Sequence, residues 1–298
     1  MSAFVFSSTP VLIQGITGRE GLFWTKHMKA YGTDIVAGVT PGKGGGTAEG
    51  IPVYDTVRQA MLNHPVELSV AFVPAAGVKD AVFESLDAGI RKMVTLADGV
   101  PLHDQLEIRS HALDVGAMVI GANCAGTVSI GEAMLGFLPV WLDYVYQPGK
   151  VGFITRSGSL TNEVASHLVA AGMGMTNIFG IGGDPVPSTR MTEVMKLLEE
   201  DPLTNALVIV GELGGTMEEE AAQMIESGGF TKPTAAFISG ATAPPEKKMG
   251  HTGAIILGKK GTVKGKIEAL ESVGAQCAPR PSLVPEALRE AIKAKSRT

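Results

Sequence analysis

Apolar runs alternate with amphipathic stretches along the first half of the chain. Short apolar runs typical of buried strands are separated there by segments with the period of helices. This alternation predicts a parallel sheet with helices on both faces. The expected strands span 11–15, 34–40, 51–55, 68–74, 92–98 and 117–123, and the expected helices span 19–31, 56–63, 77–88 and 104–115.

A second series of the same kind follows residue 150. Its expected strands are VGFITRSG, TNIFGIGG, ALVIVGELGG and PTAAFISG, with helices from about 158, from 189, and over 217–226, 261–274 and 284–294. The segment LPVWLDYVYQPGK (138–150) breaks this rhythm and is interpreted as a crossing between domains. We therefore expect an α/β protein of two doubly wound domains, residues 1–145 and 146–298.

Composition narrows the function classes. The 298 residues include 38 Gly, 45% hydrophobic and 18% charged residues, and the net charge of −5 argues against nucleic-acid binding. The two cysteines, Cys124 and Cys277, form no CxxC motif and no zinc-type spacing, so neither a disulfide framework nor a metal site is expected. No apolar run reaches membrane-spanning length and the amino terminus lacks the basic region of a signal peptide. A cytoplasmic protein is expected.

The turn after the first strand is a candidate phosphate site. Gly15-Ile16-Thr17-Gly18-Arg19-Glu20-Gly21 opens a helix, whose amino end offers backbone N–H groups to an anion. An NAD site would also need an acid at the end of the second strand. That strand instead ends in TPGKGGG (40–46), where Lys43 suits the additional phosphate of CoA. The alternative is that Lys43 is a solvated loop lysine.

The chain has no complete triphosphate loop in its sequence. Gly38 to Lys43 is one residue too short for GxxxxGK[ST], and Gly253 to Lys260 has Lys where Ser or Thr should bind Mg²⁺. Any nucleoside triphosphate is therefore expected on another polypeptide.

One of the six histidines is a candidate nucleophile. His251 lies in a loop of charges and helix breakers and has glycines close on both sides. Glu212 ends a strand, where α/β sheets place ligands, and could fix the tautomer of a histidine or merely cap a helix. Ser157, Gly158 and Ser159 open the helix after another strand and could present N–H groups to an anion.

These residues resemble the α subunit of succinyl-CoA synthetase and its relatives, the ADP- or GDP-forming acid–CoA ligases, which include malate–CoA ligase and ATP-citrate lyase. The resemblance covers nearly the whole chain. It is carried by QGITGREG, AGVTPGKGG, GANCAG, TRSGSLT, GIGGDPVP, GELGG and KKMGHTGAI.

The resemblance implies a Rossmann-like CoA-binding domain followed by a flavodoxin-like ligase domain. It implies that a triphosphate (ATP or GTP, with Mg²⁺) on an ATP-grasp β subunit phosphorylates His251, and that the phosphoryl group passes to a carboxylate that CoA then captures. Glu212 would orient His251, and Ser157, Gly158 and Ser159 would hold the phosphate. The implied CoA-binding residues are Thr17, Gly18, Arg19, Glu20, Lys43, Leu96, Ala97 and Asp98, with Asn123 and Cys124 near the thiol. The assembly would be αβ or α₂β₂.

Two departures from the succinate enzymes concern the acid. Asn162 stands where those enzymes usually have Tyr, and Arg190 follows the GGDPVPST stretch where they have an uncharged residue. An additional guanidinium suits a substrate with a further anionic group. Malate, citrate or a sulfonated short acid such as sulfoacetate are therefore alternatives to succinate. The alternative is that Arg190 faces solvent or a partner subunit.

The sequence argues against two other function classes. A non-catalytic CoA- or nucleotide-binding regulatory protein would not need His251, Glu212 and Ser157 to fit one motif set. An NAD-dependent dehydrogenase would need the acid that the second strand lacks.

Overall fold

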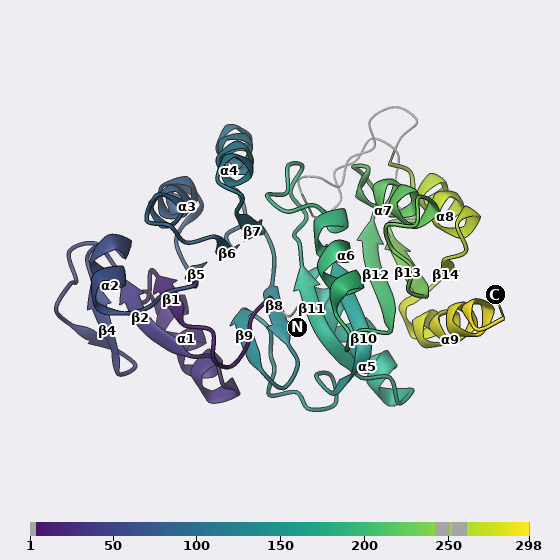
Figure 1. The fold of residues 1–298 in the computed structure, drawn as a ribbon, viewed down its shortest axis with the longest axis horizontal. Helices are drawn as coiled ribbons and strands as arrows, with labels where there is room; N and C mark the ends of the chain where they lie inside the picture. The colour runs from purple at the N-terminus through teal and green to yellow at the C-terminus, as the bar shows by residue number, and fades with distance from the viewer. Residues whose placement is uncertain (1–3, 242–250, 252–260, 298) are drawn as a thin grey trace. The chain divides into compact units, whose positions relative to one another are not determined.

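The computed structural model describes residues 4–241, 251 and 261–297 (Figure 1). The KKMGHTGAI motif therefore lies outside the described residues, apart from His251 itself. The chain divides into two compact units. One contains Val5–Pro139 and Val186–Thr189, and the other contains the remainder; the domain limits 1–145 and 146–298 stay a prediction.

The first unit is built on a sheet in the order β3-β4-β2-β1-β5-β6-β7. All neighbouring strands are parallel except β3 and β4. Its elements are β1 (Val11–Gln14), α1 (Arg19–Tyr31), β2 (Ile35–Val39), β3 (Thr47–Ala48), β4 (Ile51–Tyr54), α2 (Val57–Asn63), β5 (Leu68–Ala71), α3 (Val78–Asp87), β6 (Lys92–Thr95), α4 (Leu102–Asp114), β7 (Met118–Ile120), β8 (Gly126–Ser129) and β9 (Ala133–Gly136).

The position of β1 decides where a ligand can bind in this unit. Every residue of β1 is buried, and the strand pairs with β2 on one side and β5 on the other. The chain order therefore reverses at β1, and open α/β sheets bind ligands beside the carboxyl ends of strands at such a reversal. Gly15 follows directly with φ +75, and a Cβ there would lie 2.2 Å from the carbonyl oxygen of Phe72. Only glycine fits this turn.

Over its described residues, the second unit contains five strands in the order β14-β13-β12-β10-β11, all parallel. With β10 as the first strand, this is the flavodoxin-like order 2-1-3-4-5. The elements are β10 (Pro148–Thr155), α5 (Gly158–Ala170), β11 (Met175–Gly180), α6 (Met191–Glu200), β12 (Ala206–Glu212), α7 (Met217–Glu226), β13 (Thr234–Ser239), α8 (Val263–Ser272), β14 (Gln276–Ala278) and α9 (Val284–Lys295).

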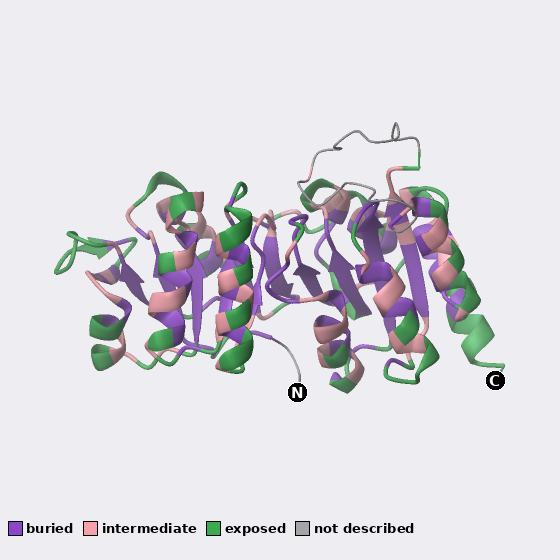
Figure 2. Cartoon of the chain, turned by 90° about the horizontal axis from the view of Figure 1, so that it is seen from above, coloured by how far each residue is buried: buried purple, intermediate pink, exposed green. Residues whose placement is uncertain are grey.

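Helices cover this second sheet in two layers. Helices α6, α7 and α8 pack side by side, whereas α5 and α9 pack against each other (Figure 1). The strands between the layers are mostly buried, and the helices expose their outer faces (Figure 2). All seven residues of β12 are buried, as expected of a central parallel strand. Both sheets therefore confirm the α/β fold.

The pattern of apolar residues missed three features. The antiparallel pair β8–β9 was not predicted, because its four-residue strands are buried throughout and show no alternation. Strands β3 and β14 are too short to give a periodic signal. The predicted helices 19–31 and 217–226 match α1 and α7.

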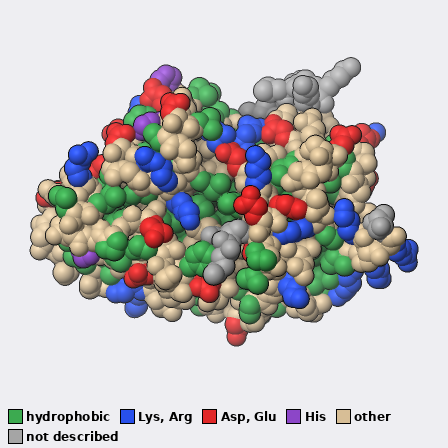
Figure 3. Space-filling model, in the orientation of Figure 1, with side chains coloured by type: hydrophobic (Ala, Val, Ile, Leu, Met, Phe, Trp, Pro, Cys, Tyr) green, Lys and Arg blue, Asp and Glu red, His purple; other side chains and the backbone are tan. Residues whose placement is uncertain are grey.

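The surface of the described residues is mixed in charge. On the face shown in Figure 3, basic and acidic side chains are interspersed among apolar ones. Within the described ranges, none of the helices combines the length and the apolar character that crossing a membrane requires.

Candidate active site

The structure brings His251 and Glu212 together. Glu212 is the last residue of β12, and its Oε2 lies 2.8 Å from Nδ1 of His251. The side chain of Glu212 is 8% exposed and that of His251 is 27% exposed. A carboxylate that accepts from Nδ1–H leaves Nε2 with its lone pair, which is the state a nucleophilic imidazole needs.

A buried arginine holds the other oxygen of Glu212. Nη2 of Arg156 lies 3.0 Å from Oε1 of Glu212, and the Arg156 side chain is only 1% exposed. Arg156 directly follows β10, the strand that pairs with β12. The two oxygens of this buried carboxylate thus face a guanidinium and an imidazole.

The backbone after β11 forms the wall behind the imidazole. A Cβ at Gly183 would lie 2.1 Å from both Cγ and Nδ1 of His251, so only glycine leaves room for the ring. Asp184 follows and is 2% exposed. The ring of His251 thus gives a steric reason for the glycine at position 183 of the GIGGDPVP motif.

The pKa of His251 is raised above its ordinary value of 6.5. The hydrogen bond to Glu212 is the largest cause. Burial of the ring and the charge of Arg156 lower this pKa, while the charges of Glu212 and Asp184 raise it further. The imidazole is therefore more basic than a free histidine, despite its partial burial.

The amino end of α5 adjoins this pair through the chain itself. Ser157, the residue after Arg156, is the N-cap of α5, and its side chain accepts from the N–H of Leu160 at 3.4 Å. Gly158 and Ser159 are the first residues of the helix, and Ser159 is exposed. Free N–H groups and the positive end of the helix dipole face outward here.

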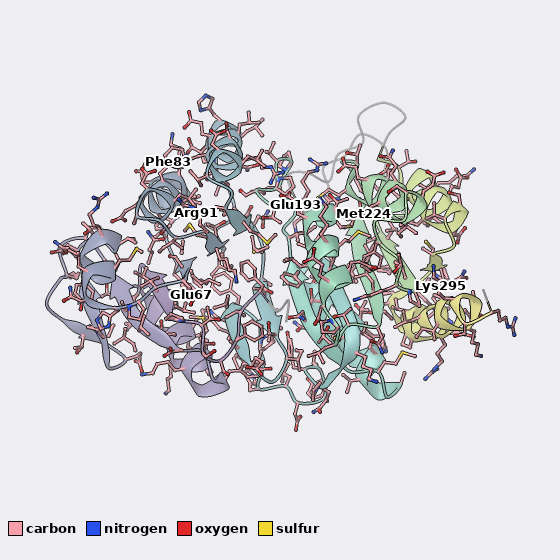
Figure 4. All side chains as sticks on the ribbon, viewed as in Figure 1. Glu67, Phe83, Arg91, Glu193, Met224 and Lys295 are labelled. Carbon is pink, nitrogen blue, oxygen red and sulfur yellow. The ribbon has the colours of Figure 1, made fainter. Side chains whose placement is uncertain are left out.

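Asn162 and Arg190 both have protein partners. The hydroxyl of Tyr146 donates to Oδ1 of Asn162 at 2.6 Å. Arg190 forms a two-pronged ion pair with Glu220 of α7, in which Nε donates to Oε2 at 2.8 Å. Its backbone N–H donates to Glu193, which is labelled in Figure 4. The guanidinium of Arg190, 37% exposed, is thus already neutralised by a carboxylate.

The first unit has a cavity at the reversal beside β1. Its volume is about 640 Å³, within the usual range for small-molecule sites. Thr17 and Gly18 line it. The lining also includes residues that the sequence did not single out for binding, namely Pro41, Phe72, Val73, Pro74 and Asp80.

The other predicted CoA residues lie on loops of the first unit. Arg19 and Glu20 begin α1 and pair with each other at 3.2 Å, and Lys43 lies on the exposed loop after β2. Leu96, Ala97 and Asp98 follow β6. The N–H of Asn123 donates to Ala97 at 2.9 Å, and the thiol of Cys124 lies 3.4 Å from the carbonyl oxygen of Thr95. Two of the predicted loops are thereby joined.

Four residues around the His251–Glu212 pair, two of them behind Glu212, were not predicted from the sequence. Gly183 and Arg156 stood inside quoted motifs, but nothing in the sequence indicated their contacts. Glu218 and Lys266, whose side chains are 0% exposed, lie in α7 and α8 and gave no local signal.

The chain matches two sequence families and several characterised proteins. It matches the CoA binding domain over residues 6–99 and the CoA-ligase family over residues 154–276. The ADP-forming sulfoacetate-CoA ligase subunit of Bilophila wadsworthia is 56% identical over 284 residues, 95% of this chain and 97% of that protein. An ADP-forming sulfoacetate-CoA ligase subunit of an Acholeplasma species is 54% identical, covering 97% of this chain and 98% of that protein.

Succinate enzymes and a lyase structure are also similar. The α subunit of the ADP-forming succinate–CoA ligase of Aquifex aeolicus is 45% identical, covering 98% of this chain and 95% of that one. The structure of ATP citrate lyase from Methanothrix soehngenii, in complex with citrate and coenzyme A, aligns with a TM-score of 0.89 at 24% identity. The alignment covers 99% of this chain and 51% of the lyase, so this chain spans about half of that lyase chain and shares its fold.

We predict that Gly183→Ala uncouples the imidazole from Glu212. The new methyl group would lie 2.1 Å from the ring, so the ring must move. The overall ligase rate should fall at least about 100-fold, the scale for losing a positioned acid–base group. Gly229→Ala is the control, because its Cβ would contact only Met224, with the side-chain Cγ at 3.2 Å and the carbonyl oxygen at 3.4 Å. Equal rates for the two variants would contradict the prediction.

The raised pKa of His251 predicts the pH dependence of its reaction. An imidazole must lose its second proton before Nε2 can act as a nucleophile, so the rate should rise with pH to a plateau, with a midpoint above 6.5. Glu212→Gln removes the main cause of the raised pKa. Its midpoint should therefore move to lower pH while the plateau rate falls by about 10²–10⁴-fold. A midpoint that stays in place would show that Glu212 does not act on the ring.

Proposed function

This chain belongs to the family of ADP-forming acid–CoA ligases as an α subunit, and we propose that His251 is its phosphoryl carrier. The observation that carries the proposal is the 2.8 Å contact between Nδ1 of His251 and Glu212. This contact leaves Nε2 as the nucleophile. Strand β10, which pairs with the strand that ends in Glu212, leads into the amino terminus of α5.

The reaction has three balanced steps in this proposal. Nε2 of His251 attacks the terminal phosphorus of a nucleoside triphosphate; the N–P bond forms, the P–O bond breaks and the diphosphate leaves. A carboxylate oxygen of the acid then attacks the same phosphorus, and the N–P bond breaks to give an acyl phosphate. The CoA thiolate attacks the acyl carbon, and inorganic phosphate departs with the electrons of the C–O bond.

Each group of residues has a part in these steps. Glu212 orients the ring and stabilises the positive charge that develops on it during attack. Ser157, Gly158 and Ser159 offer N–H and hydroxyl donors to the phosphoryl oxygens at the start of α5. Arg156 forms an ion pair with the other oxygen of Glu212.

The first unit is proposed to bind CoA. Glycine at position 15 lets the chain turn tightly at the 640 Å³ cavity, and Thr17 and Gly18 line it. Arg19, Glu20 and Lys43 would meet phosphates from exposed positions, while the loop of Leu96, Ala97 and Asp98 and the linked Asn123 and Cys124 would follow the pantetheine arm.

An α subunit of this family works with a β subunit. We propose that an ATP-grasp β subunit supplies the ATP or GTP with its Mg²⁺, in an αβ or α₂β₂ assembly. This division is consistent with the two incomplete phosphate loops of the sequence.

The acid is proposed to be a short sulfonated carboxylic acid such as sulfoacetate. Two relatives that share 56% and 54% identity with this chain are sulfoacetate-CoA ligase subunits, whereas the succinate relative shares 45%. Asn162 and Arg190 are the proposed acid-selecting residues. Malate and citrate remain the competing acids, because each carries polar or anionic groups that succinate lacks.

We predict that His251→Asn abolishes thioester synthesis and leaves CoA binding within a few-fold of wild type. The variant retains side-chain polarity but has no imidazole, and CoA is proposed to bind residues of the first unit. The measurement is transfer of radiolabelled phosphate from ATP to the α chain in the complex with β, with calorimetry for CoA. Acid-labile, alkali-stable label on the variant would contradict the role of His251 as phosphoryl carrier.

A second prediction concerns the acid. If Arg190 contacts the sulfonate of the acid, Arg190→Ala should lower kcat/KM for sulfoacetate at least about ten-fold more than for succinate, because only the acid whose anionic group fits the guanidinium loses an ion pair. Glu220→Gln, which removes the partner carboxylate, should instead lower the KM for sulfoacetate. If Arg190 only links α6 to α7, both variants should be less stable, and the ratio of kcat/KM for the two acids should stay unchanged.

A further inference from the structure

Behind the His251–Glu212 pair lies a fully buried cluster of charges. The side chains of Arg156, Glu218 and Lys266 are 1%, 0% and 0% exposed. They come from the end of β10, from α7 and from α8, so three separate elements each contribute a charge. We call Glu212, Arg156, Glu218 and Lys266 the charge relay.

The charge relay alternates in sign along a continuous path. Arg156 lies 3.0 Å from Oε1 of Glu212 through Nη2 and 3.3 Å from Oε1 of Glu218 through Nη1. The second oxygen of Glu218 accepts from Nζ of Lys266. The order His251–Glu212–Arg156–Glu218–Lys266 therefore joins the ring to a lysine on α8.

Lys266 also fixes the backbone that carries Glu212. Its Nζ donates to the carbonyl oxygens of Glu212 at 2.9 Å and Gly214 at 2.7 Å. Glu218 in turn accepts from the N–H of Glu212 at 3.2 Å. The end of β12 is thus held from both sides by the two residues farthest from the ring.

The charges balance within the relay. Two cations and two carboxylates give a net charge of zero, which is the condition under which buried ions are tolerated. The pKa of Glu218 is lowered despite its complete burial, because the charges of Arg156 and Lys266 and the hydrogen bonds from Lys266 and from the N–H of Glu212 outweigh desolvation. Arg156 is shared between two carboxylates, so its hold on Glu212 depends on how far Lys266 satisfies Glu218.

We infer that Lys266 and Glu218 are positioning residues that act through Arg156 to set how strongly Glu212 holds the proton of His251. This inference rests on the proposed role of His251 as phosphoryl carrier. Neither residue touches the reacting atoms. Among the residues that the structure describes, two further charged groups act on this path: Asp184, which acts on the ring, and Glu219, whose Oε2 lies 3.9 Å from Lys266.

The two residues should act with opposite signs. Without the charge of Lys266, Glu218 draws more on Arg156, Glu212 holds the ring proton more strongly, and His251 becomes more basic. Without the charge of Glu218, Arg156 belongs to Glu212 alone, and His251 becomes less basic. A purely structural role would instead make both losses act alike.

The test is the pH dependence of single-turnover phosphorylation of the α chain by radiolabelled ATP in the complete complex with β. The midpoint should move to higher pH in Lys266→Met and to lower pH in Glu218→Gln. At one pH below both midpoints, rates normalised to each plateau should differ about ten-fold between the variants, the equivalent of one pKa unit between them. In the double variant Arg156 again belongs to Glu212 alone, so its midpoint should follow that of Glu218→Gln.

Two controls keep the experiment decisive. Lys266→Arg preserves the charge and should leave the midpoint in place even if the plateau falls. Lys264→Met, on the same helix but 86% exposed, should change neither. If Lys266→Met does not fold, Glu218→Gln alone decides by the sign of its shift.

Shifts in the same direction, or no shift in variants that still become phosphorylated, would overturn the inference. Failure of the proposed function would look different. In that case wild type itself would carry no label, or His251→Asn would carry as much as wild type.

Discussion

One oxygen of Glu212 accepts a hydrogen bond from an imidazole, and the other forms an ion pair with a guanidinium. A carboxylate that is only 8% exposed needs such partners, because burying an unpaired charge is costly. The burial of Arg156 then requires a second carboxylate, Glu218, and the burial of Glu218 requires Lys266. One catalytic geometry at the end of β12 thus dictates charged side chains at three further positions in the core of the second unit.

Parallel strand order explains why these side chains can meet at all. Strands β10, β12 and β13 run in one direction, so their carboxyl ends share one edge of the sheet. Residues 156 and 212 are far apart in sequence yet follow or end neighbouring strands. The first unit uses the same rule at β1, where the reversal of strand order leaves the cavity lined by Thr17 and Gly18.

Elements with a clear period were predictable, and so were residues within local motifs. Helix α7 was predicted with its limits, yet its acidic first turn, MEEE, is also what an exposed helix start looks like. Only tertiary packing separates the fully buried Glu218 from its neighbours. The contact between His251 and Glu212 was expected from the resemblance, whereas the roles of Gly183 and Lys266 depend on distances between elements that no local pattern records.

The side chains proposed to select the acid share one physical property, which is that each already has a protein partner. Asn162 accepts from Tyr146, and Arg190 is neutralised by Glu220. An acid that reaches Arg190 must therefore compete with a carboxylate that is already in place, and a group with a full negative charge competes better than a neutral one. Under the proposed function, selectivity would then arise as a difference between two ion pairs rather than from the attraction of a lone cation. Such an arrangement penalises any acid that displaces Glu220 without replacing its charge. A sulfonate and a second carboxylate both replace that charge, so discrimination between sulfoacetate and succinate would depend on the shape and reach of the anionic group.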